Sequence, residues 1–344
     1  MCRLGAEGHM DIAIVGAGRM GRVHAAALRH APSAQVVAVV DTDAAVAADL
    51  AAPLGAAVYT DLSDLLATRP IDIVDIVTPH HAHASAVSTA LDAGAHVLCE
   101  KPIALSVGEA SELVRRAADR GRRLLVKSYQ RYSTAICALR DSLLGGRIGR
   151  PYLLVGSFAS TQLGNLADPA DWHGDLVRCG GGVLVDAGYH LVDLAHFCFG
   201  PAVEISATVQ RGVSPAASKG EDVAAVTLSF ASGALASLVA TWADTSLPLR
   251  FEYRAYCTDG MTELRQSDGR SRVRVFSRHE QIADAVEDEW WGSANARAVS
   301  ELVEDIRTGR PSSGEARESI RTLASVFAAY DSASSGRAVR LPAA

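Results

Sequence analysis

In the first third of the chain, short runs of consecutive apolar residues alternate with amphipathic segments of helical length. The apolar runs occupy residues 11–16, 35–40, 71–78, 96–100 and 123–129. Continuous apolar strands of this kind are typical of a parallel sheet that helices cover on both faces. The pattern therefore predicts a doubly wound α/β domain over residues 1–130, with its ligand at the carboxyl ends of the strands.

The hydrophobic pattern changes after about residue 150. Strand-like runs now follow one another, separated by turns of Gly, Asp and Ser, at residues 203–212, 222–233, 234–242, 249–260 and 272–277. Such a succession is typical of hairpins in an antiparallel sheet. Two helical patterns follow at 295–309 and 315–336, each ending at a glycine. Residues 131–344 are thus predicted to form a second α/β domain with a large, mostly antiparallel, open sheet.

The composition argues against several kinds of partner. The net charge is −6 and no run of basic residues occurs, so we expect neither nucleic acid nor a membrane surface as a partner. No apolar stretch reaches the roughly 20 residues that a membrane helix needs. Residues 1–10 lack the apolar core of a signal peptide, so we expect a cytoplasmic protein. The six cysteines show no CxxC spacing, which predicts free thiols and no metal site.

A glycine-rich turn follows the first predicted strand. Gly16, Gly18 and Gly21 form a GxGxxG pattern between that strand and a helix, and Asp41 ends the second strand twenty residues later. The glycines let a pyrophosphate approach the backbone at the helix N-terminus. A carboxylate at position 41 accepts hydrogen bonds from ribose hydroxyls and repels a 2′-phosphate, so we expect NAD rather than NADP. Candidate cofactor-binding residues here are Gly16, Gly18, Arg19, Met20 and Asp41.

Arginine is strongly preferred over lysine in this chain. Only three of the 33 basic residues are lysines, and one of them, Lys101, directly follows a predicted buried strand. Arginine would serve equally well as a surface charge, whereas a compact ammonium whose pKa responds to its surroundings requires lysine. Lys101 is therefore a candidate catalytic residue.

A second candidate site lies in the second predicted domain. Three glycines at 180–182 precede a predicted helix on which Asp186 and His190 are four residues apart. That spacing places both side chains on one face of a helix. The pair could act on a ligand, but a capped helix with a surface Asp–His pair has the same pattern. The residues alone leave both interpretations open.

Taken together, these motifs resemble the glucose-fructose oxidoreductase/inositol dehydrogenase (Gfo/Idh/MocA) family. The resemblance rests on the glycine loop, on Glu100-Lys101-Pro102 after the fifth strand, and on the GGGxLxDxGxHxxD pattern of residues 180–193, and it runs through nearly the whole chain. It implies a Rossmann NAD-binding domain followed by a substrate-binding and oligomerisation domain. It adds further residues to the expected cofactor site, namely Thr78, Pro79, His83, Glu100 and Lys101.

The resemblance also implies a catalytic set of Lys101, Asp186 and His190. His190 is expected to act as general base for a carbinol proton while hydride leaves to nicotinamide C4, because the pKa of imidazole lies near neutrality. Lys101 is expected to stabilise negative charge on the reacting oxygen, and Asp186 to orient a substrate hydroxyl. The implied substrate is a sugar, amino sugar or cyclitol, and the implied assembly a homodimer or homotetramer. The expected substrate-binding residues are Lys101, Trp172, His173, Asp175, Asp186 and His190.

Two acidic segments that contain tryptophan bear on the charge of the substrate. Asp168, Asp171 and Asp175 surround Trp172, and residues 286–291 combine three carboxylates with two tryptophans. Aromatic faces suit a sugar ring, and carboxylates suit its hydroxyls or an ammonium group. We therefore consider an amino sugar as the substrate, with a solvated acidic loop around a packed tryptophan as the alternative.

Other functions remain open on the sequence. The same fold would permit a non-catalytic NAD(H) sensor, and NAD-dependent glycoside hydrolysis also occurs within the family that the chain resembles. His80, His81 and His83 match the HxH metal pair of an amidohydrolase barrel, although no eightfold strand–helix repeat accompanies them. We expect His24 to be a packed helix residue.

Overall fold

The chain divides into two compact units. The structure, a computed structural model, describes residues 9–31, 33–215, 218–244, 249–267, 269–288, 290–310 and 316–342. The first unit comprises residues 1–129 and 292–320, and the second comprises residues 130–291 and 321–344. This division differs from the predicted one because residues 292–320 group with the first unit. There the guanidinium of Arg123 donates a hydrogen bond to the carbonyl of Gly309 at 2.7 Å.

The first unit contains a six-stranded sheet in the order β3-β2-β1-β4-β5-β6. All five pairings are parallel, which confirms the doubly wound prediction. The central strands β4 and β5 are buried along their whole length because helices cover both faces. They are mainly apolar, and their polar residues, Asp75, His96 and Glu100, are buried too. The strands are β1 (Met10–Val15), β2 (Ala34–Val40), β3 (Ala57–Tyr59), β4 (Ile73–Ile76), β5 (His96–Glu100) and β6 (Leu124–Lys127).

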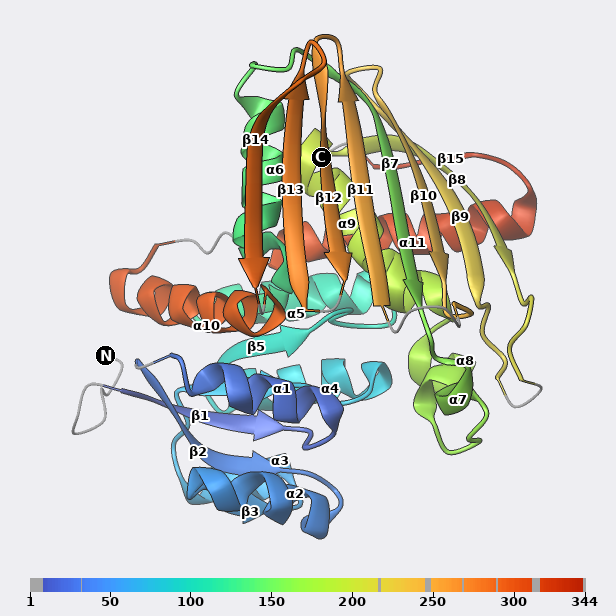
Figure 1. Cartoon of the computed structure of the whole chain (residues 1–344). Helices are drawn as coiled ribbons and strands as arrows, with labels where there is room; N and C mark the ends of the chain where they lie inside the picture. The colour runs from blue at the N-terminus through green and yellow to red at the C-terminus, as the bar shows by residue number, and fades with distance from the viewer. Residues whose placement is uncertain are drawn as a thin grey trace. The chain divides into compact units, whose positions relative to one another are not determined.

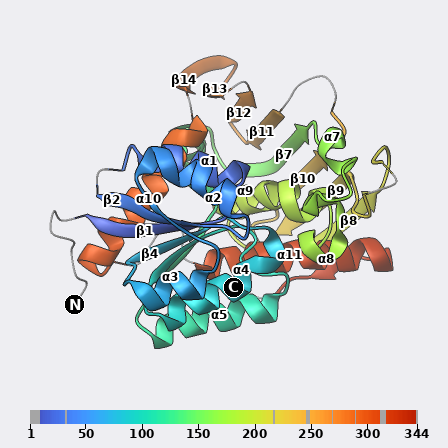
Figure 2. The ribbon, with the colours of Figure 1, turned by 90° about the horizontal axis from the view of Figure 1, so that it is seen from below.

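Helices flank this sheet on both sides. Figures 1 and 2 show α1 and α2 on one side of it and α3, α4 and α5 on the other. Several of these helices begin at a capping side chain, as α2 does at Asp43 and α5 at Ser106. The helices of the unit are α1 (Arg19–Leu28), α2 (Ala44–Ala51), α3 (Leu62–Thr68), α4 (His80–Asp92), α5 (Val107–Asp119) and most of α10 (Trp290–Thr308).

The second unit contains a nine-stranded sheet in the order β14-β13-β12-β11-β7-β10-β9-β8-β15. Seven of its eight pairings are antiparallel, and β7 pairs with β10 in parallel, so the expected mostly antiparallel sheet is confirmed. Its strands are β7 (Pro151–Ser160), β8 (Ala202–Gln210), β9 (Val223–Phe230), β10 (Leu235–Thr241), β11 (Leu249–Cys257), β12 (Gly260–Ser267), β13 (Arg270–Ser277), β14 (Glu280–Asp288) and β15 (Val339–Arg340).

Helices cover one face of this large sheet. The longer ones, α6, α9 and α11, lie behind the strands in Figure 1. Along β9 and β10, buried and exposed residues alternate, as expected for a sheet with one covered face. Among the described residues, no helix is both long and apolar enough to cross a bilayer. The helices are α6 (Thr134–Leu144), α7 (Leu163–Leu166), α8 (Leu176–Cys179), α9 (Tyr189–Phe199) and α11 (Ala316–Ser335), whose first turn belongs to the first unit.

Candidate active site

The glycine loop between β1 and α1 has the geometry of a phosphate-binding turn. Gly16 adopts a φ of +104°, and a Cβ atom there would lie 2.8 Å from the carbonyl oxygen of Val77. A Cβ atom on Gly21 would lie 2.1 Å from the carbonyl oxygen of Gly16, so these two glycines are required by packing. Gly18 is exposed, and nothing lies within 4 Å of its Cβ position. The loop therefore has room for a pyrophosphate at the N-terminus of α1.

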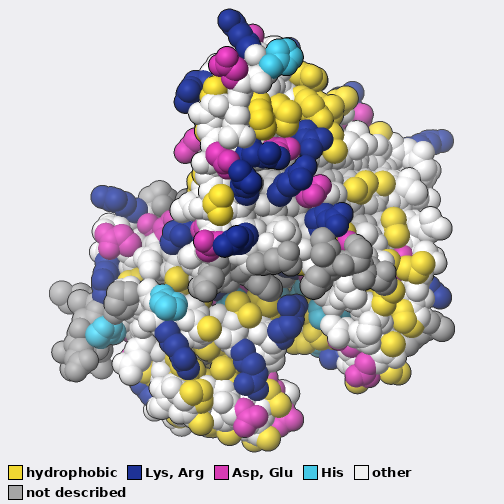
Figure 3. Space-filling view, in the orientation of Figure 1, with side chains coloured by type: hydrophobic (Ala, Val, Ile, Leu, Met, Phe, Trp, Pro, Cys, Tyr) yellow, Lys and Arg dark blue, Asp and Glu magenta, His cyan; other side chains and the backbone are white. Residues whose placement is uncertain are grey.

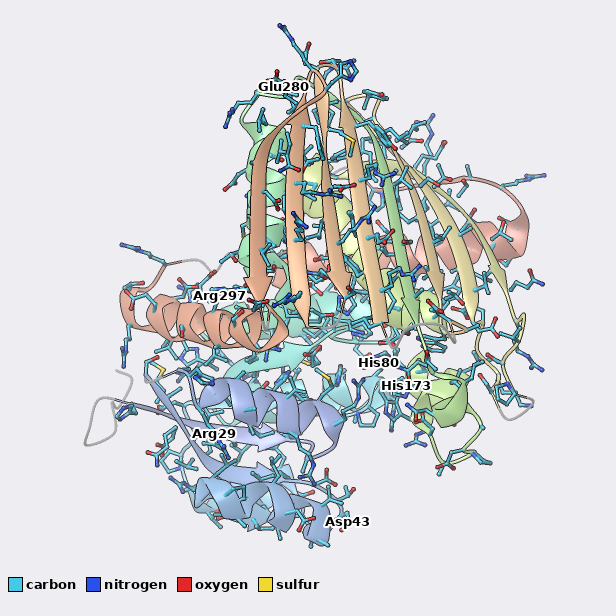
Figure 4. All side chains as sticks on the ribbon, in the orientation of Figure 1. Arg29, Asp43, His80, His173, Glu280 and Arg297 are labelled. Carbon is cyan, nitrogen blue, oxygen red and sulfur yellow. The ribbon has the colours of Figure 1, made fainter. Side chains whose placement is uncertain are left out.

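The carboxylate of Asp41 is held at the end of β2 by two backbone groups. Its Oδ2 accepts a hydrogen bond from Ala17 N at 2.7 Å, and its Oδ1 accepts one from Asp43 N at 3.0 Å. Asp43, labelled in Figure 4, in turn caps helix α2. Arg19 is exposed and Met20 half-buried at the start of α1. The expected ribose-binding carboxylate is thus tied directly to the glycine loop, a connection that the sequence did not reveal.

His83 connects the turns that follow β4 and β5. Its Nδ1 lies 2.7 Å from the carbonyl oxygen of Pro102 and its Nε2 lies 2.7 Å from that of Thr78. Burial lowers the pKa of His83, and the two carbonyls oppose this effect. The imidazole lies wholly inside the unit, with both nitrogens against backbone oxygens. The structure therefore brings Thr78, His83 and the turn after Lys101 together, with His83 behind the two turns.

Glu100 ends strand β5 and Lys101 follows it directly, and both are buried. The Glu100 carboxylate faces Nε2 of His24 at 2.9 Å through Oε1, and its Oε2 accepts a hydrogen bond from Lys101 N at 3.3 Å. Burial alone would raise the pKa of Glu100. The hydrogen bond and charge of His24, together with the charges of Lys127 and Lys101, instead hold it at about 2. Glu100 is thus an ionised carboxylate inside the unit, directly before the candidate catalytic lysine.

In the second unit, Asp186 lies in a turn of π-helix, Leu184–Gly188, that leads directly into α9. The sequence predicted a regular helix here, and the structure differs by this wider turn, a form that occurs frequently at functional sites. Asp186 is half-buried. His190, in the first turn of α9, is 5% exposed, and its ring stacks at 6.4 Å on the ring of Phe158 from β7. The two candidate residues therefore lie on consecutive turns, Asp186 in the π-turn and His190 in the first turn of α9.

A buried clamp explains the glycines before this turn. A Cβ atom on Gly182 would lie 2.1 Å from the carbonyl oxygen of Glu221, and one on Gly181 would lie 2.1 Å from the hydroxyl of Tyr330. The Glu221 carboxylate accepts hydrogen bonds from Leu184 N at 2.9 Å and from the Tyr330 hydroxyl at 2.8 Å. That hydroxyl accepts from Val185 N at 3.2 Å and from Gly182 N at 3.3 Å. The clamp satisfies the backbone donors at the start of the π-turn, which is where a helix leaves them unpaired.

An ion pair anchors α9 one turn beyond His190. Asp193 accepts two hydrogen bonds from Arg131, at 2.9 Å from Nε and 2.8 Å from Nη2, and a third from the Thr322 hydroxyl at 2.9 Å. Burial would raise the pKa of Asp193, but the adjacent guanidinium and these hydrogen bonds lower it. Farther along α9, Nε2 of His196 lies 2.9 Å from the Ser325 hydroxyl. Helix α9 is thus fastened along its buried face.

The tryptophan loop before α8 is organised by its own aspartates. The ring of His173, labelled in Figure 4, stacks on that of Trp172 at 3.8 Å. Asp171 Oδ1 accepts from His173 N at 2.8 Å and faces its Nδ1 at 2.7 Å. Asp175 Oδ1 caps α8, and Asp168 Oδ1 accepts from Ala170 N at 2.9 Å. Each of these carboxylates therefore has a local structural role through one oxygen.

The second acidic segment also has structural partners. Glu287 accepts hydrogen bonds from the Ser133 hydroxyl at 2.7 Å and from Ala135 N at 3.2 Å, and Asp288 pairs with Arg270 at 2.7 Å. Glu289 and the side chains of Trp290 and Trp291 lie outside the part of the chain that the structure describes.

The expected catalytic residues are divided between the two units. Lys101 belongs to the first unit, and Asp186 and His190 belong to the second, as do Trp172, His173 and Asp175. The sequence indicates only a packing role for His24 and does not single out Glu221 or Tyr330. It includes Asp193 in the glycine-led motif but assigns it no role. The sequence did contain a signal for the partners of His24. Three predicted apolar strands each include a charged residue, namely Asp75, Glu100 or Lys127. Among the described residues, no group of three or more His, Cys, Asp or Glu side chains could hold a metal.

Comparison with known proteins identifies the family. The profile "Oxidoreductase family, NAD-binding Rossmann fold" matches residues 10–128, and the profile "GFO/IDH/MocA C-terminal domain" matches residues 136–263. D-apiose dehydrogenase from Rhizobium rhizogenes is 30% identical over 295 residues, which are 83% of this chain and 84% of that enzyme. The chain belongs to the Gfo/Idh/MocA oxidoreductase family. It is therefore an oxidoreductase with an NAD-binding Rossmann domain, and the amidohydrolase interpretation of His80, His81 and His83 is wrong.

Other members of the Gfo/Idh/MocA family match almost the whole chain. D-apiose dehydrogenase from Paraburkholderia graminis is 29% identical and covers 96% of this chain and 89% of its own. The crystal structure of GenD2 from gentamicin A biosynthesis, in complex with NAD, has a TM-score of 0.85 at 28% identity over 97% of both chains. Levoglucosan dehydrogenase in complex with NADH and levoglucosan has a TM-score of 0.86 at 21% identity, which shows a shared fold.

Proposed function

We propose that this protein is an NAD-dependent dehydrogenase that oxidises a secondary hydroxyl of a sugar, amino sugar or cyclitol, or reduces the corresponding ketone. The observation that carries the proposal is the presence of Lys101, buried at the carboxyl end of β5, together with Asp186 and His190 on the clamped turn of the second unit. Family relatives named for D-apiose and inositol dehydrogenation support the substrate class.

The proposed roles follow from the chemistry of the side chains. NAD, when bound, accepts the hydride. His190 takes the proton of the reacting hydroxyl, since an imidazole exchanges protons near neutral pH. Lys101 donates a hydrogen bond to the reacting oxygen and stabilises its negative charge. Asp186 accepts a hydrogen bond from a substrate hydroxyl and so orients the carbon that loses hydride.

The proposal is tested by three variants of the catalytic set. Lys101→Ala and His190→Ala should each lower kcat by ~10²-fold or more while NAD affinity changes little. Lys101→Arg should not restore turnover, because guanidinium is bulkier and its charge is fixed. Turnover is followed by NADH absorbance with a panel of sugars and polyols, and Lys219→Ala, at an exposed lysine, is the matched control. Wild-type turnover by Lys101→Arg would contradict the role of Lys101. NAD binding without turnover of any panel member would favour a sensor.

Cofactor choice is proposed to depend on the charge of Asp41. Asp41→Asn retains an acceptor for the Ala17 N–H group but removes the negative charge, so NADP affinity should rise on the order of tenfold. Asp43→Asn is the matched control, because that side chain caps α2. Isothermal calorimetry with both cofactors makes the measurement. Unmodified protein that bound NADP more tightly than NAD would overturn this role.

The tryptophan loop is proposed to favour a cationic substrate. Asp168, Asp171 and Asp175 use Oδ1 for local hydrogen bonds, and among the described residues no hydrogen bond to their Oδ2 atoms is found. An ammonium group would be attracted to these oxygens, so KM should rise with ionic strength. Asp175→Asn should raise KM more than it lowers kcat. A preference for a neutral sugar over its amino analogue would end this proposal.

The exposed face of the nine-stranded sheet is proposed to join subunits into a homodimer, or into a tetramer built from dimers. Over β9 and β10, apolar side chains are visible on this face in Figure 3, and Val155, Val223, Leu235 and Val239 are each 38–48% exposed. Val239→Glu should lower the mass measured by light scattering, whereas Val213→Glu, in an exposed loop, should not. A monomeric unmodified protein would contradict the proposal.

A further inference from the structure

A buried cluster of four ionisable side chains lies beneath the Lys101 turn, entirely within the first unit. His24 projects from α1 and is fully buried. Its Nδ1 lies 2.8 Å from Oδ2 of Asp75 on β4, and its Nε2 lies 2.9 Å from Oε1 of Glu100 on β5. The ammonium of Lys127, at the end of β6, lies 3.1 and 3.0 Å from the same two ring nitrogens. Three neighbouring strands and one helix thus contribute to one cluster.

The geometry determines how many protons His24 carries. A neutral imidazole has one N–H donor, whereas both ring nitrogens here face carboxylate oxygens, which accept. With both carboxylates ionised, both contacts are hydrogen bonds only when both nitrogens are protonated. The ammonium of Lys127 then has no acceptor on the ring, and the negative charges of Asp75 and Glu100 hold it in the cluster. A positive His24 then gives the cluster two anions and two cations, which is the balance that buried charges require. Asp75 Oδ1 has no hydrogen-bond partner among the described residues, so this carboxylate depends strongly on His24.

Glu100 connects this cluster to the candidate catalytic lysine. One of its oxygens faces His24, and the other accepts the backbone N–H of Lys101. We propose that His24, as a doubly protonated imidazolium, is a positioning residue that fixes Glu100 and thereby the Lys101 turn at the end of β5. This inference rests on the proposed function for the role of Lys101, whereas the charge state of His24 does not.

The pKa of His24 is consistent with this arrangement. Burial alone would lower it, and Lys127 opposes protonation too, but the carboxylates of Asp75 and Glu100 together raise the pKa above its usual value. Deprotonation at alkaline pH removes one of the two donors and leaves a buried carboxylate without one. The charged and titratable groups that face the cluster are Asp75 from β4, Glu100 and Cys99 from β5, Lys127 from β6, Lys101 from the turn after β5, and His83 from α4.

The charge state is tested directly on the unmodified full chain. In a ¹⁵N spectrum of histidine-labelled protein at neutral pH, both nitrogens of His24 should show imidazolium shifts. His96, whose pKa burial lowers to about 4, is an internal standard that should be neutral. Selective labelling of lysine side chains gives only three signals, so the signal of Lys101 can be followed through the titration of His24. A neutral His24, or a Lys101 signal that does not respond to its titration, overturns the proposal.

Variants then test the link to catalysis. His24→Gln keeps a polar side chain but cannot carry the charge, so kcat should fall ~10–100-fold while NAD affinity and KM stay within about threefold. In the unmodified enzyme, kcat should fall at alkaline pH as His24 loses its proton. The His24→Gln variant should lack this fall. His96→Gln, at the other end of β5, is the matched control for loss of a buried histidine. A folded His24→Gln variant with wild-type kcat and pH profile would overturn the proposal. If the variant does not fold, the coupled titration in unmodified protein decides.

The positioning role of His24 and the dehydrogenase activity can each fail separately, and the experiments tell the two results apart. If no substrate of the panel is turned over, the dehydrogenase proposal fails, while the spectra still establish or refute the imidazolium and its coupling to Lys101. If the enzyme is active and Lys101→Ala is inactive, but the two signals titrate independently, only the positioning role of His24 is refuted.

Discussion

The two units hold a buried carboxylate next to a candidate catalytic residue, but they use different cations to do so. In the first unit, Glu100 precedes Lys101 and faces His24. In the second unit, Asp193 lies one turn beyond His190 and is paired with Arg131. Imidazole loses its charge within a few pH units of neutrality, whereas guanidinium does not deprotonate in proteins. The same structural task is therefore sensitive to pH in one unit and insensitive to it in the other.

The difference follows from what surrounds each carboxylate. Asp193 receives a planar pair of N–H donors from Arg131, so one side chain neutralises it completely. Glu100 shares His24 with a second carboxylate, Asp75, and the imidazole ring is small enough to fit between them. An arginine presents its donors as one fork on one side and would not divide them between two opposed acceptors. Histidine is the cation that can bridge two strands of the sheet.

The largest expected effect on stability comes from breaking the ion pair between Arg131 and Asp193. Arg131→Ala leaves Asp193 buried without its cation, so the free energy of unfolding of the second unit should fall by about 3–5 kcal/mol. Urea denaturation followed by tryptophan fluorescence makes the measurement, since Trp172 and Trp242 lie in this unit. The double variant Arg131→Met/Asp193→Leu should recover most of the loss. A loss below about 1 kcal/mol would show that the pair is not the anchor of α9.

A second prediction uses pH to separate two buried histidines. Burial lowers the pKa of His196 to about 4 from 6.5, so its contribution to stability is complete above 6.5 and is lost as the pH falls toward 4. The expected loss of unfolding free energy is on the order of 3 kcal/mol. His24 has the opposite sign, because its pKa is raised. Its contribution is complete below 6.5 and is lost as the pH rises through the folded-state value.

Unfolding curves across this pH range, with His196→Gln and His24→Gln compared, measure both effects. The His196 variant should lose the part of the acid-side dependence that His196 contributes, while His96 and His83 keep theirs, and the His24 variant should lose the alkaline-side dependence of His24. If unfolding free energy depended on pH in the same way in both variants, the expected opposite pH effects of His196 and His24 would be refuted.

The smallest expected effect concerns the Glu221–Tyr330 clamp of the second unit. Tyr330→Phe removes the hydroxyl that bonds Glu221 and receives two backbone N–H groups, at a cost of about 1–3 kcal/mol. The pH profile of kcat should keep the shape of the wild type, because no charge is lost. Tyr256→Phe, on β11, serves as a control for tyrosine removal. A shifted profile would mean that this clamp also contributes charge to the site.

The sequence predicted the first unit more closely than the second. The strand expected at 96–100 matches β5, because a short apolar run between two helical segments is distinct from its neighbours. Strand β3 was missed because it has three residues, and β14 because its residues do not alternate between apolar and polar. The motif residues near the candidate site were recognised, but their supports were not. The bond between Asp41 and Ala17, the π-turn at Asp186 and the partners of His24 depend on contacts between segments far apart in the chain.

The edges of the nine-stranded sheet have a consequence for aggregation. At one edge, β14 is exposed along most of its length and carries Glu280, Asp284, Glu287 and Asp288. At the other edge, β15 offers only two residues, Val339–Arg340. Like charges on an exposed strand repel a second copy of the same strand, and a two-residue strand is too short to template another. Edge-to-edge pairing of two sheets into fibrils is thus disfavoured at both edges. Removing the charges of β14 would leave a long edge strand on which a second chain could pair, and aggregation should increase.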